Sequence, residues 1–175
     1  MSDNAPATLT IYGVEGKENY IAQLLSGDSF GTVWGEYSTS ADQVLNGETY
    51  VSDEADIRSI DSLGTAFEGL GLSYVISQDA KYEHDGIIRM YTPELGAFVG
   101  TANQTGTVTV SAPTLVEKVL RLLDEAVQIE EGYEGYEEVV FFNSETVIEA
   151  TTALEDLVGF KWTRALDKLA ESAKA

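Results

Sequence analysis

The sequence predicts an α+β fold: an antiparallel β-meander of about four to five strands, with three to four helices packed on one face. The middle of the chain places short β-branched and aromatic runs between glycine-containing turns, and the last third repeats apolar residues at helical spacing. Strands followed by helices are typical of the α+β class. The 175 residues suit a single domain, 1–175. A subdivision near residue 112 would separate the meander from a helical, acidic C-terminal part.

The first fifty residues predict one strand and one short helix. Residues 8–14 (TLTIYGV) have the β-branched and aromatic content of a strand, and residues 19–25 predict a helix that ends at Gly27. No regular element is assigned to residues 31–51. Within that stretch, Trp34, Tyr37 and Tyr50 are expected to anchor loops or short strands to the core.

Residues 53–70 predict a helix, and a meander follows it. Apolar residues recur three and four positions apart within 53–70, and acids stand at its start, where the helix dipole favours them. Asp85-Gly86 is a strong signal for a hairpin turn. The strands predicted around it are residues 72–77, 87–91, 97–101 and 107–110.

The C-terminal third predicts helices. Residues 111–126 carry one apolar stripe, with Ser111 as a plausible N-cap and Pro113 in the first turn. Residues 136–142 predict either a further strand or the lead-in to the last helices. Residues 144–158 have helical spacing, and residues 161–173 predict an amphipathic helix with Trp162, Leu166 and Leu169 on one face.

Negative charge is the most unusual property of the chain. It has 30 acidic residues against 10 basic ones, for a net charge of −20. Residues 18–57 contain eight acids and no Lys or Arg, and residues 122–160 contain eleven acids and again no Lys or Arg. Direct binding to nucleic acid or to an anionic membrane requires a basic face, so this composition argues strongly against both.

A surface of one charge sign suits a basic protein partner. Duplex DNA carries one charge per ~1.7 Å of axis, so a net charge of −20 equals that of about ten base pairs. The sequence therefore predicts a DNA mimic that occludes the basic groove of a nucleic-acid-processing enzyme. The expected contact residues are the densest acidic stretch with its two tyrosines, and a second acidic patch: Glu130, Glu131, Tyr133, Glu134, Tyr136, Glu137 and Glu138, with Asp53, Glu54 and Asp56.

In composition the chain is similar to small acidic inhibitors that phages and plasmids encode against restriction or CRISPR enzymes, and to immunity proteins against nuclease toxins. The similarity implies a non-enzymatic inhibitor. The first residues lack the basic start and the apolar stretch of a signal peptide, so the expected location is the cytoplasm, which is the host cytoplasm if a phage encodes it. Two alternatives stay open. The acidic face could be an interaction or solubility surface of an assembly or structural protein, or the charge could reflect halophilic adaptation. A homodimer is compatible with the sequence as well and would double the charged array of a mimic.

No residue pattern predicts catalysis, a cofactor or a metal. The chain has no cysteine. Its one histidine, His84, stands beside Asp85 in a predicted hairpin tip, where polar residues are common without any role as a general base. Asp53, Glu54 and Asp56 resemble a weak cation cluster but are better explained as the acidic first turn of a helix. No apolar run approaches the ~20 residues that span a bilayer.

Overall fold

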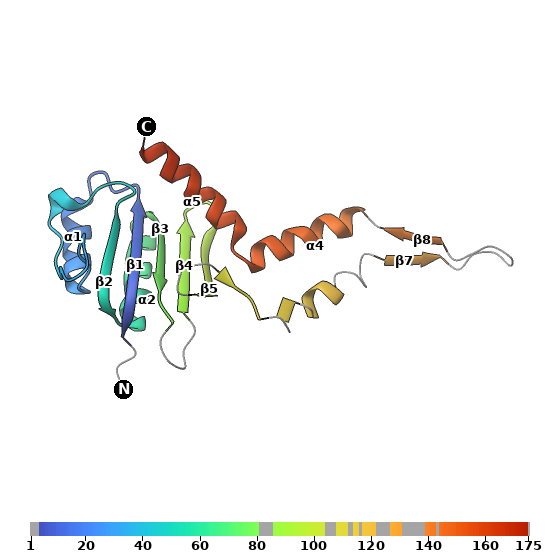
Figure 1. The fold of residues 1–175 in the computed structure, drawn as a ribbon. Coiled ribbons are helices and arrows are strands. Elements are labelled where there is room, and N and C mark those ends of the chain that lie inside the picture. The colour runs from blue at the N-terminus through green and yellow to red at the C-terminus, as the bar shows by residue number, and fades with distance from the viewer. Residues whose placement is uncertain are drawn as a thin grey trace. The chain divides into compact units, whose positions relative to one another are not determined.

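The computed structural model describes residues 4–80, 86–103, 108–111, 114–115, 117–121, 127–130, 139–142 and 144–174. It confirms the α+β class (Figure 1). The chain divides into two compact units, the first formed by Met1–Thr109 and Lys161–Ala175 and the second by Val110–Phe160. Whether the whole chain folds as one domain stays a prediction. None of the described helices is long and apolar enough to cross a membrane.

The first unit contains an open, six-stranded antiparallel sheet in the order β2-β1-β3-β4-β5-β6, so most of it is a meander. This sheet has six strands where four to five were predicted, and the strand that was not predicted is residues 49–55, at the sheet edge. The bounds of the strands are β1 Ala5–Tyr12, β2 Thr49–Ala55, β3 Ser73–Gln78, β4 Gly86–Thr92, β5 Gly96–Ala102 and β6 Val108–Thr109.

The predicted hairpin is confirmed as the antiparallel pair β3 and β4. Gly86, however, was expected in the turn and lies in a strand. Gly86 is the first residue of β4 and lies opposite Ala102 of β5. A Cβ there would meet the carbonyl oxygens of Ala102 and Gln78 at 2.7 Å each, so only glycine fits between the neighbouring strands. Asp85 and His84 lie outside the described residues.

Helices α1 (Glu18–Gly27) and α2 (Ile57–Gly69) cover one face of the sheet. Alternate residues of β1 point to that face, and Leu9 is fully buried there between Tyr50 of β2 and Ile76 of β3. Burial of such side chains is worth about 1.5–3 kcal/mol each. The helices contribute Ile21, Leu25, Ile60, Leu63 and Phe67 to the same core.

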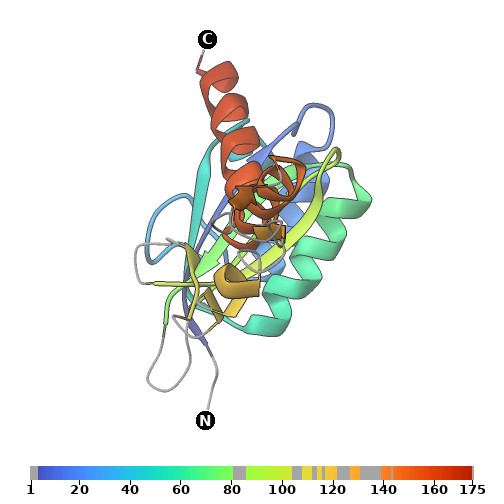
Figure 2. The same cartoon turned by 90° about the vertical axis from the view of Figure 1, so that its right-hand side faces the viewer.

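Helix α5 (Phe160–Ala173) packs on the opposite face of the sheet (Figure 2). Leu166 is buried there, and the Trp162 ring lies 5.2 Å from that of Phe98. The prediction that all helices pack on one face is therefore wrong, although the predicted apolar side of this helix is confirmed. The reason lies in the strands: in β4, Ile88 and Met90 point to one face and Arg89 and Tyr91 to the other, so both faces need a cover.

The described part of the second unit contains helix α4 (Ser144–Leu157) and two paired strands, β7 (Val127–Glu130) and β8 (Val139–Phe142). Residues 114–115 and 117–121 are also helical. The predicted N-cap at Ser111 is confirmed: its Oγ accepts a hydrogen bond from the Thr114 backbone amide at 3.3 Å. The end of that predicted helix, residues 122–126, lies outside the described residues.

Candidate interaction surface

The strongest predicted contact stretch falls mostly outside the described residues. Glu131, Tyr133, Glu134, Tyr136, Glu137 and Glu138 all belong to residues 131–138, of which the structure gives no description. Glu130 is the last residue of β7 and lies opposite Val139 of β8. This part of the prediction therefore stays a prediction.

Of the three acids in the second predicted patch, only Asp56 stands at the start of a helix. Asp53 and Glu54 belong to β2, at the point where its register with β1 shifts, from Ala7 opposite Ser52 to Ala5 opposite Ala55. Across this shift β2 advances by three residues while β1 advances by two, so one extra residue of β2 is accommodated at an irregularity of the bulge kind. The prediction of a helix beginning at residue 53 is wrong by four positions.

Asp56 is the residue that begins the helix. It has extended backbone dihedral angles (φ −81°, ψ 142°), and its Oδ1 accepts a hydrogen bond from the Arg58 amide at 2.7 Å. That is the geometry of an N-cap, which satisfies one of the free amides at the helix start. Asp56 therefore has a structural role. Within the part of the chain that the structure describes, no cluster of three or more carboxylates or histidines could hold a metal ion.

The largest departure from the predicted site is a set of exposed aromatic side chains before β2. Trp34 is 54% exposed and Tyr37 is 57% exposed, and Val33 beside them is 55% exposed. Both aromatics were expected to anchor the loop to the core, and for both the expectation is wrong. It is confirmed for Tyr50, which is fully buried. Tryptophan is usually among the most buried side chains on average, so its exposure in a loop is informative.

The backbone of this loop is held in place by hydrogen bonds at its stem and tip. Gly31 pairs with Val51 of the edge strand, through bonds of 2.9 and 2.8 Å. The Gly35 amide donates to Oδ2 of Asp53 at 3.1 Å, and Gly35 has a φ of +85°, which favours glycine. Thr39 closes the loop by donating to the Phe30 carbonyl at 2.8 Å. The aromatics are therefore displayed by an ordered backbone beside β2.

Carboxylates accompany these aromatics. Glu36 is exposed between Trp34 and Tyr37, and Asp53 binds the tip of the loop. We call Val33, Trp34, Glu36, Tyr37 and Asp53 the acidic-aromatic surface. It lies within residues 18–57, where the sequence has no Lys or Arg. Exposed aromatic residues are typical of the centre of a protein-binding site, and polar groups are typical of its rim.

Two acids of the same sequence window, Glu18 and Asp42, have lowered pKa values and are therefore charged at neutral pH. The pKa of Glu18 lies below its ordinary value because backbone amides, its own and that of Gly16, donate hydrogen bonds to its carboxylate. The pKa of Asp42 is lowered by hydrogen bonds from the Ser40 hydroxyl and from its own amide. Hydrogen bonds that favour the charged form have this effect.

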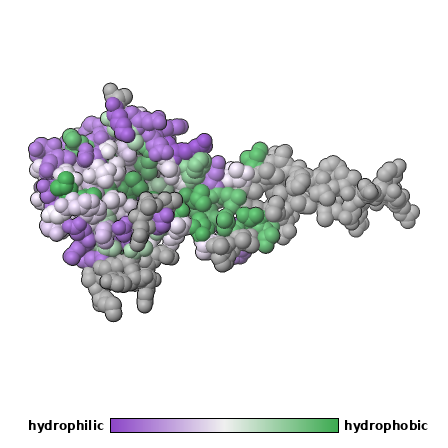
Figure 3. All heavy atoms as spheres, in the orientation of Figure 1, coloured by the Kyte–Doolittle hydropathy of each residue, from purple (hydrophilic) through white to green (hydrophobic). Residues whose placement is uncertain are grey.

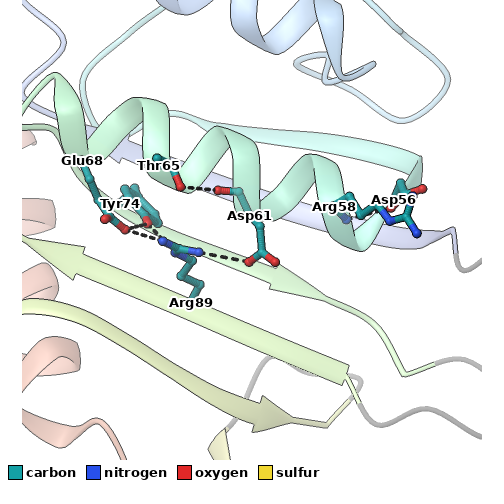
Figure 4. Close-up of polar contacts among 7 residues, drawn as sticks. All are labelled: Asp56, Arg58, Asp61, Thr65, Glu68, Tyr74 and Arg89. Atoms are coloured by element: carbon teal, nitrogen blue, oxygen red, sulfur yellow. Dashed lines mark hydrogen bonds and ion pairs between the residues drawn. The ribbon is translucent and has the colours of Figure 1, made fainter.

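A second charged cluster, centred on Arg89, has a structural role (Figure 4). The Arg89 side chain is only 14% exposed on the sheet face under α2. Its Nη2 lies 2.6 Å from Oε1 of Glu68, its Nη1 lies 3.0 Å from Oδ1 of Asp61, and its Nε donates to Oη of Tyr74 at 2.8 Å. Tyr74 in turn donates to Glu68 at 2.7 Å.

The buried guanidinium of Arg89 donates hydrogen bonds to groups on both α2 and β3, so the network holds α2 on the sheet and we assign it a structural role. Burial, together with the hydrogen bond to Glu68, raises the pKa of the Tyr74 hydroxyl. Burial works against the charged form of Glu68, but hydrogen bonds from Arg89 and Tyr74 outweigh it and hold its pKa below the ordinary value. Both groups therefore keep their ordinary protonation states at neutral pH.

The sequence matches no family model, and comparison with curated proteins and with solved structures finds no significant similarity. Function therefore has to be inferred from the surface itself.

Proposed function

We propose that this chain is a non-enzymatic binding protein that presents a negative surface to a basic protein. Its partner would be a nucleic-acid-processing enzyme, and the chain would act as a DNA mimic that occludes the enzyme's basic groove. The observation that carries the proposal is the acidic-aromatic surface: two aromatics more than half exposed on a hydrogen-bonded loop, with carboxylates beside them and no base in residues 18–57.

Carboxylates and aromatic side chains would contribute to binding in different ways. Carboxylates steer a basic partner into encounter and compete with phosphates for its Lys and Arg side chains. Trp34 and Tyr37 supply apolar area at the centre of the contact, where aromatic residues typically carry most of the binding energy. Aromatic faces also stack on arginine guanidinium groups, which are common in nucleic-acid grooves. The acidic stretch from Glu130 to Glu138, in the second unit, would make a charged contact of its own.

The experiment starts from the basic, heparin-binding fraction of a bacterial lysate, passed over the immobilised chain at low salt. Proteins retained are eluted with duplex DNA and identified by mass spectrometry. The proposal predicts a nucleic-acid enzyme among them, displaced by DNA and lost at high salt. Retention that survives molar salt and is not displaced by DNA would contradict mimicry.

Variants then locate the contact. Trp34→Ser with Tyr37→Ser should weaken binding to the captured enzyme at least tenfold, since hot-spot side chains are worth about 2 kcal/mol or more each. The control is Val99→Ser, an exposed apolar residue on β5. Equal losses from both variants would exclude this surface as the contact.

A charge-matched pair tests the carboxylates. Glu36→Gln with Glu54→Gln removes two exposed acids from the region of the acidic-aromatic surface, and Glu15→Gln with Glu171→Gln removes two exposed acids elsewhere. The first pair should slow association more than the second. The predicted C-terminal contact is tested in the same way, by replacing its five glutamates with glutamine.

A role in assembly is the second candidate, and one observation favours it. In the described part of the second unit, Leu115 is 40% exposed, Leu120 is 56% exposed and Ile148 is 65% exposed. Hydrophobic residues are prominent on that part of the surface in Figure 3, whereas the described surface of the first unit is mostly hydrophilic. Light scattering over a concentration series would show self-association that resists salt if apolar contact drives it.

A further inference from the structure

The two edges of the six-stranded sheet are protected to different degrees. β2 forms one edge, and β5 with the short β6 forms the other (Figure 1). At the first edge, β2 pairs with Gly31 through Val51, carries the charges of Asp53 and Glu54, and has an irregular register with β1. Charged side chains and irregularities of this kind are the usual protection of an edge strand against pairing with another chain.

The outer edge of β5 is covered over only part of its length. β6 pairs with Thr101 and Ala102, so residues 96–100 of β5 extend beyond it. Among the residues that the structure describes, no strand or bridge pairs with 96–100 on that side. Alternate residues of a paired strand direct their amide and carbonyl groups away from the neighbouring strand, so this stretch presents backbone donors and acceptors outward. At ~3.4 Å per residue, it is roughly 17 Å long.

The side chains along this stretch suit a further strand. Residues 96–100 (GAFVG) contain no charge and no proline. Val99 lies on the same face of the sheet as α2 and is 62% exposed, whereas Phe98 lies on the other face against Trp162. Trp162 also donates a hydrogen bond from Nε1 to the Gly96 carbonyl at 2.9 Å, which holds the start of β5 in place. An added strand would find Val99 on one face and the Phe98–Trp162 pair on the other.

The kind of partner follows from what this edge can pair with. A row of outward amides and carbonyls is satisfied by an extended backbone, which forms hydrogen bonds along its whole length. A second copy of this chain is disfavoured, because each copy carries a net charge of −20. The same charge attracts a basic segment. The exposed Val99 favours β-branched side chains on the face that the added strand shares with it.

We propose that the outer edge of β5 binds an extended, basic segment of a partner protein, which adds a strand to the sheet beside residues 96–100. Main-chain hydrogen bonds would supply the affinity, and Val99 would select β-branched residues at alternate positions of the segment. Lysine or arginine at its ends would supply long-range attraction. The edge lies across the sheet from β2, which borders the acidic-aromatic surface, so this proposal does not depend on the proposed function.

The test uses the full chain and a capped peptide, Lys-Thr-Val-Thr-Val-Thr-Lys, followed by amide NMR titration. We expect saturable shifts centred on residues 96–100, with slower hydrogen exchange at alternate amides of that stretch. The control peptide has the same side chains and charges, but carries an N-methyl group on every inner residue, so it has lost its main-chain donors. It should not bind, because the affinity of an added strand comes from the backbone.

Matched variants assign the site. Val99→Ser removes the apolar contact at the edge, and Leu45→Ser makes the same change at a residue that is 55% exposed elsewhere in the first unit. Val99→Ser should weaken peptide binding about fivefold, which is the loss of one good cross-strand pair. Leu45→Ser should weaken it less than about twofold. Circular dichroism checks that both variants are folded.

Four outcomes would overturn the proposal. The peptide does not saturate, the methylated peptide binds as tightly as the parent peptide, or the two variants act equally. The fourth is a shift of the β5 signals with protein concentration in the absence of peptide, which would identify a second copy of the chain as the occupant of the edge.

Discussion

Gly64 is the position where α2 approaches the Arg89 network most closely. A Cβ built there would lie 2.7 Å from Nε of Arg89 and 2.7 Å from Oη of Tyr74, closer than real Cβ atoms come to other heavy atoms. We predict that Gly64→Ala lowers the free energy of unfolding by about 2 kcal/mol, although alanine is the better helix former.

Two opposing effects give that magnitude. Replacing glycine by alanine inside a helix favours folding by about 1 kcal/mol. The added methyl group displaces the guanidinium of Arg89, which weakens about two of its hydrogen bonds to Glu68, Asp61 and Tyr74. Hydrogen bonds to charged groups contribute about 1.5–3 kcal/mol each, so the loss is about 3 kcal/mol and exceeds the gain.

Urea denaturation followed by circular dichroism measures the effect, with Gly69→Ala as the matched control. Gly69 is the last residue of the same helix, and a Cβ there meets nothing within 4 Å. That control should leave stability unchanged or raise it by up to about 1 kcal/mol. In an Arg89→Met background there is no guanidinium to displace, so Gly64→Ala should lower the free energy of unfolding by less than it does in the parent chain. If Gly64→Ala is as stable as the parent chain, the guanidinium relaxes without loss and the reasoning fails.

Three further predictions concern stability. Asp56→Ala removes the N-cap of α2 and should cost about 1 kcal/mol in urea unfolding, whereas Glu54→Ala on the exposed bulge should change it by less than about 0.5 kcal/mol. Tyr50→Phe removes hydrogen bonds of 3.0 and 3.2 Å to the preceding loop and should cost about 1 kcal/mol; no change in the urea midpoint would mean that they contribute nothing. The pKa of Glu68 is lower folded than its ordinary 4.5, so its contribution is present above that pH and is lost as pH falls through the folded pKa. Stability should therefore fall less between pH 7 and pH 3 in Glu68→Gln than in the parent chain.

Periodic elements were predictable because their signal is local. Residues 144–158 and 161–173 have apolar stripes that only a helix presents on one side, and helices α4 and α5 lie there. Trp162, Leu166 and Leu169 pack on the sheet as expected. The meander strands were predictable in the same way, from β-branched runs between turns.

The edge strand β2 was missed because its features depend on a partner far along the chain. Asp53 and Glu54 look like the acidic first turn of a helix, and a true N-cap follows at Asp56. Only pairing with β1 makes residues 49–55 a strand, and one extra residue of β2 is accommodated there at an irregularity of the bulge kind. Residues 87–91 (IIRMY) place apolar or aromatic side chains on both sides of the strand, with Arg89 as the one charged residue, which was a sign that both sheet faces are covered.

The acidic-aromatic surface was missed for a different reason. Residue type favours burial of Trp34 and Tyr37, and propensity carries no information about which way a loop turns. Their exposure follows from Gly35 at positive φ and from its hydrogen bond to Asp53, neither of which is a periodic signal. Glycines at 31 and 35 around an aromatic, between acids, were the one local indication.

Helix α5 completes the first unit from the far end of the chain, after the second unit, Val110–Phe160, has been made. The sheet face that carries Ile88, Met90 and Phe98 is therefore uncovered while the ribosome synthesises residues 110–173. At roughly 5–20 residues per second, that interval lasts several seconds. A nascent chain with a finished sheet and one open apolar face is a substrate for holding chaperones. Slower translation of residues 110–160 would lengthen this exposure and with it the opportunity for aggregation.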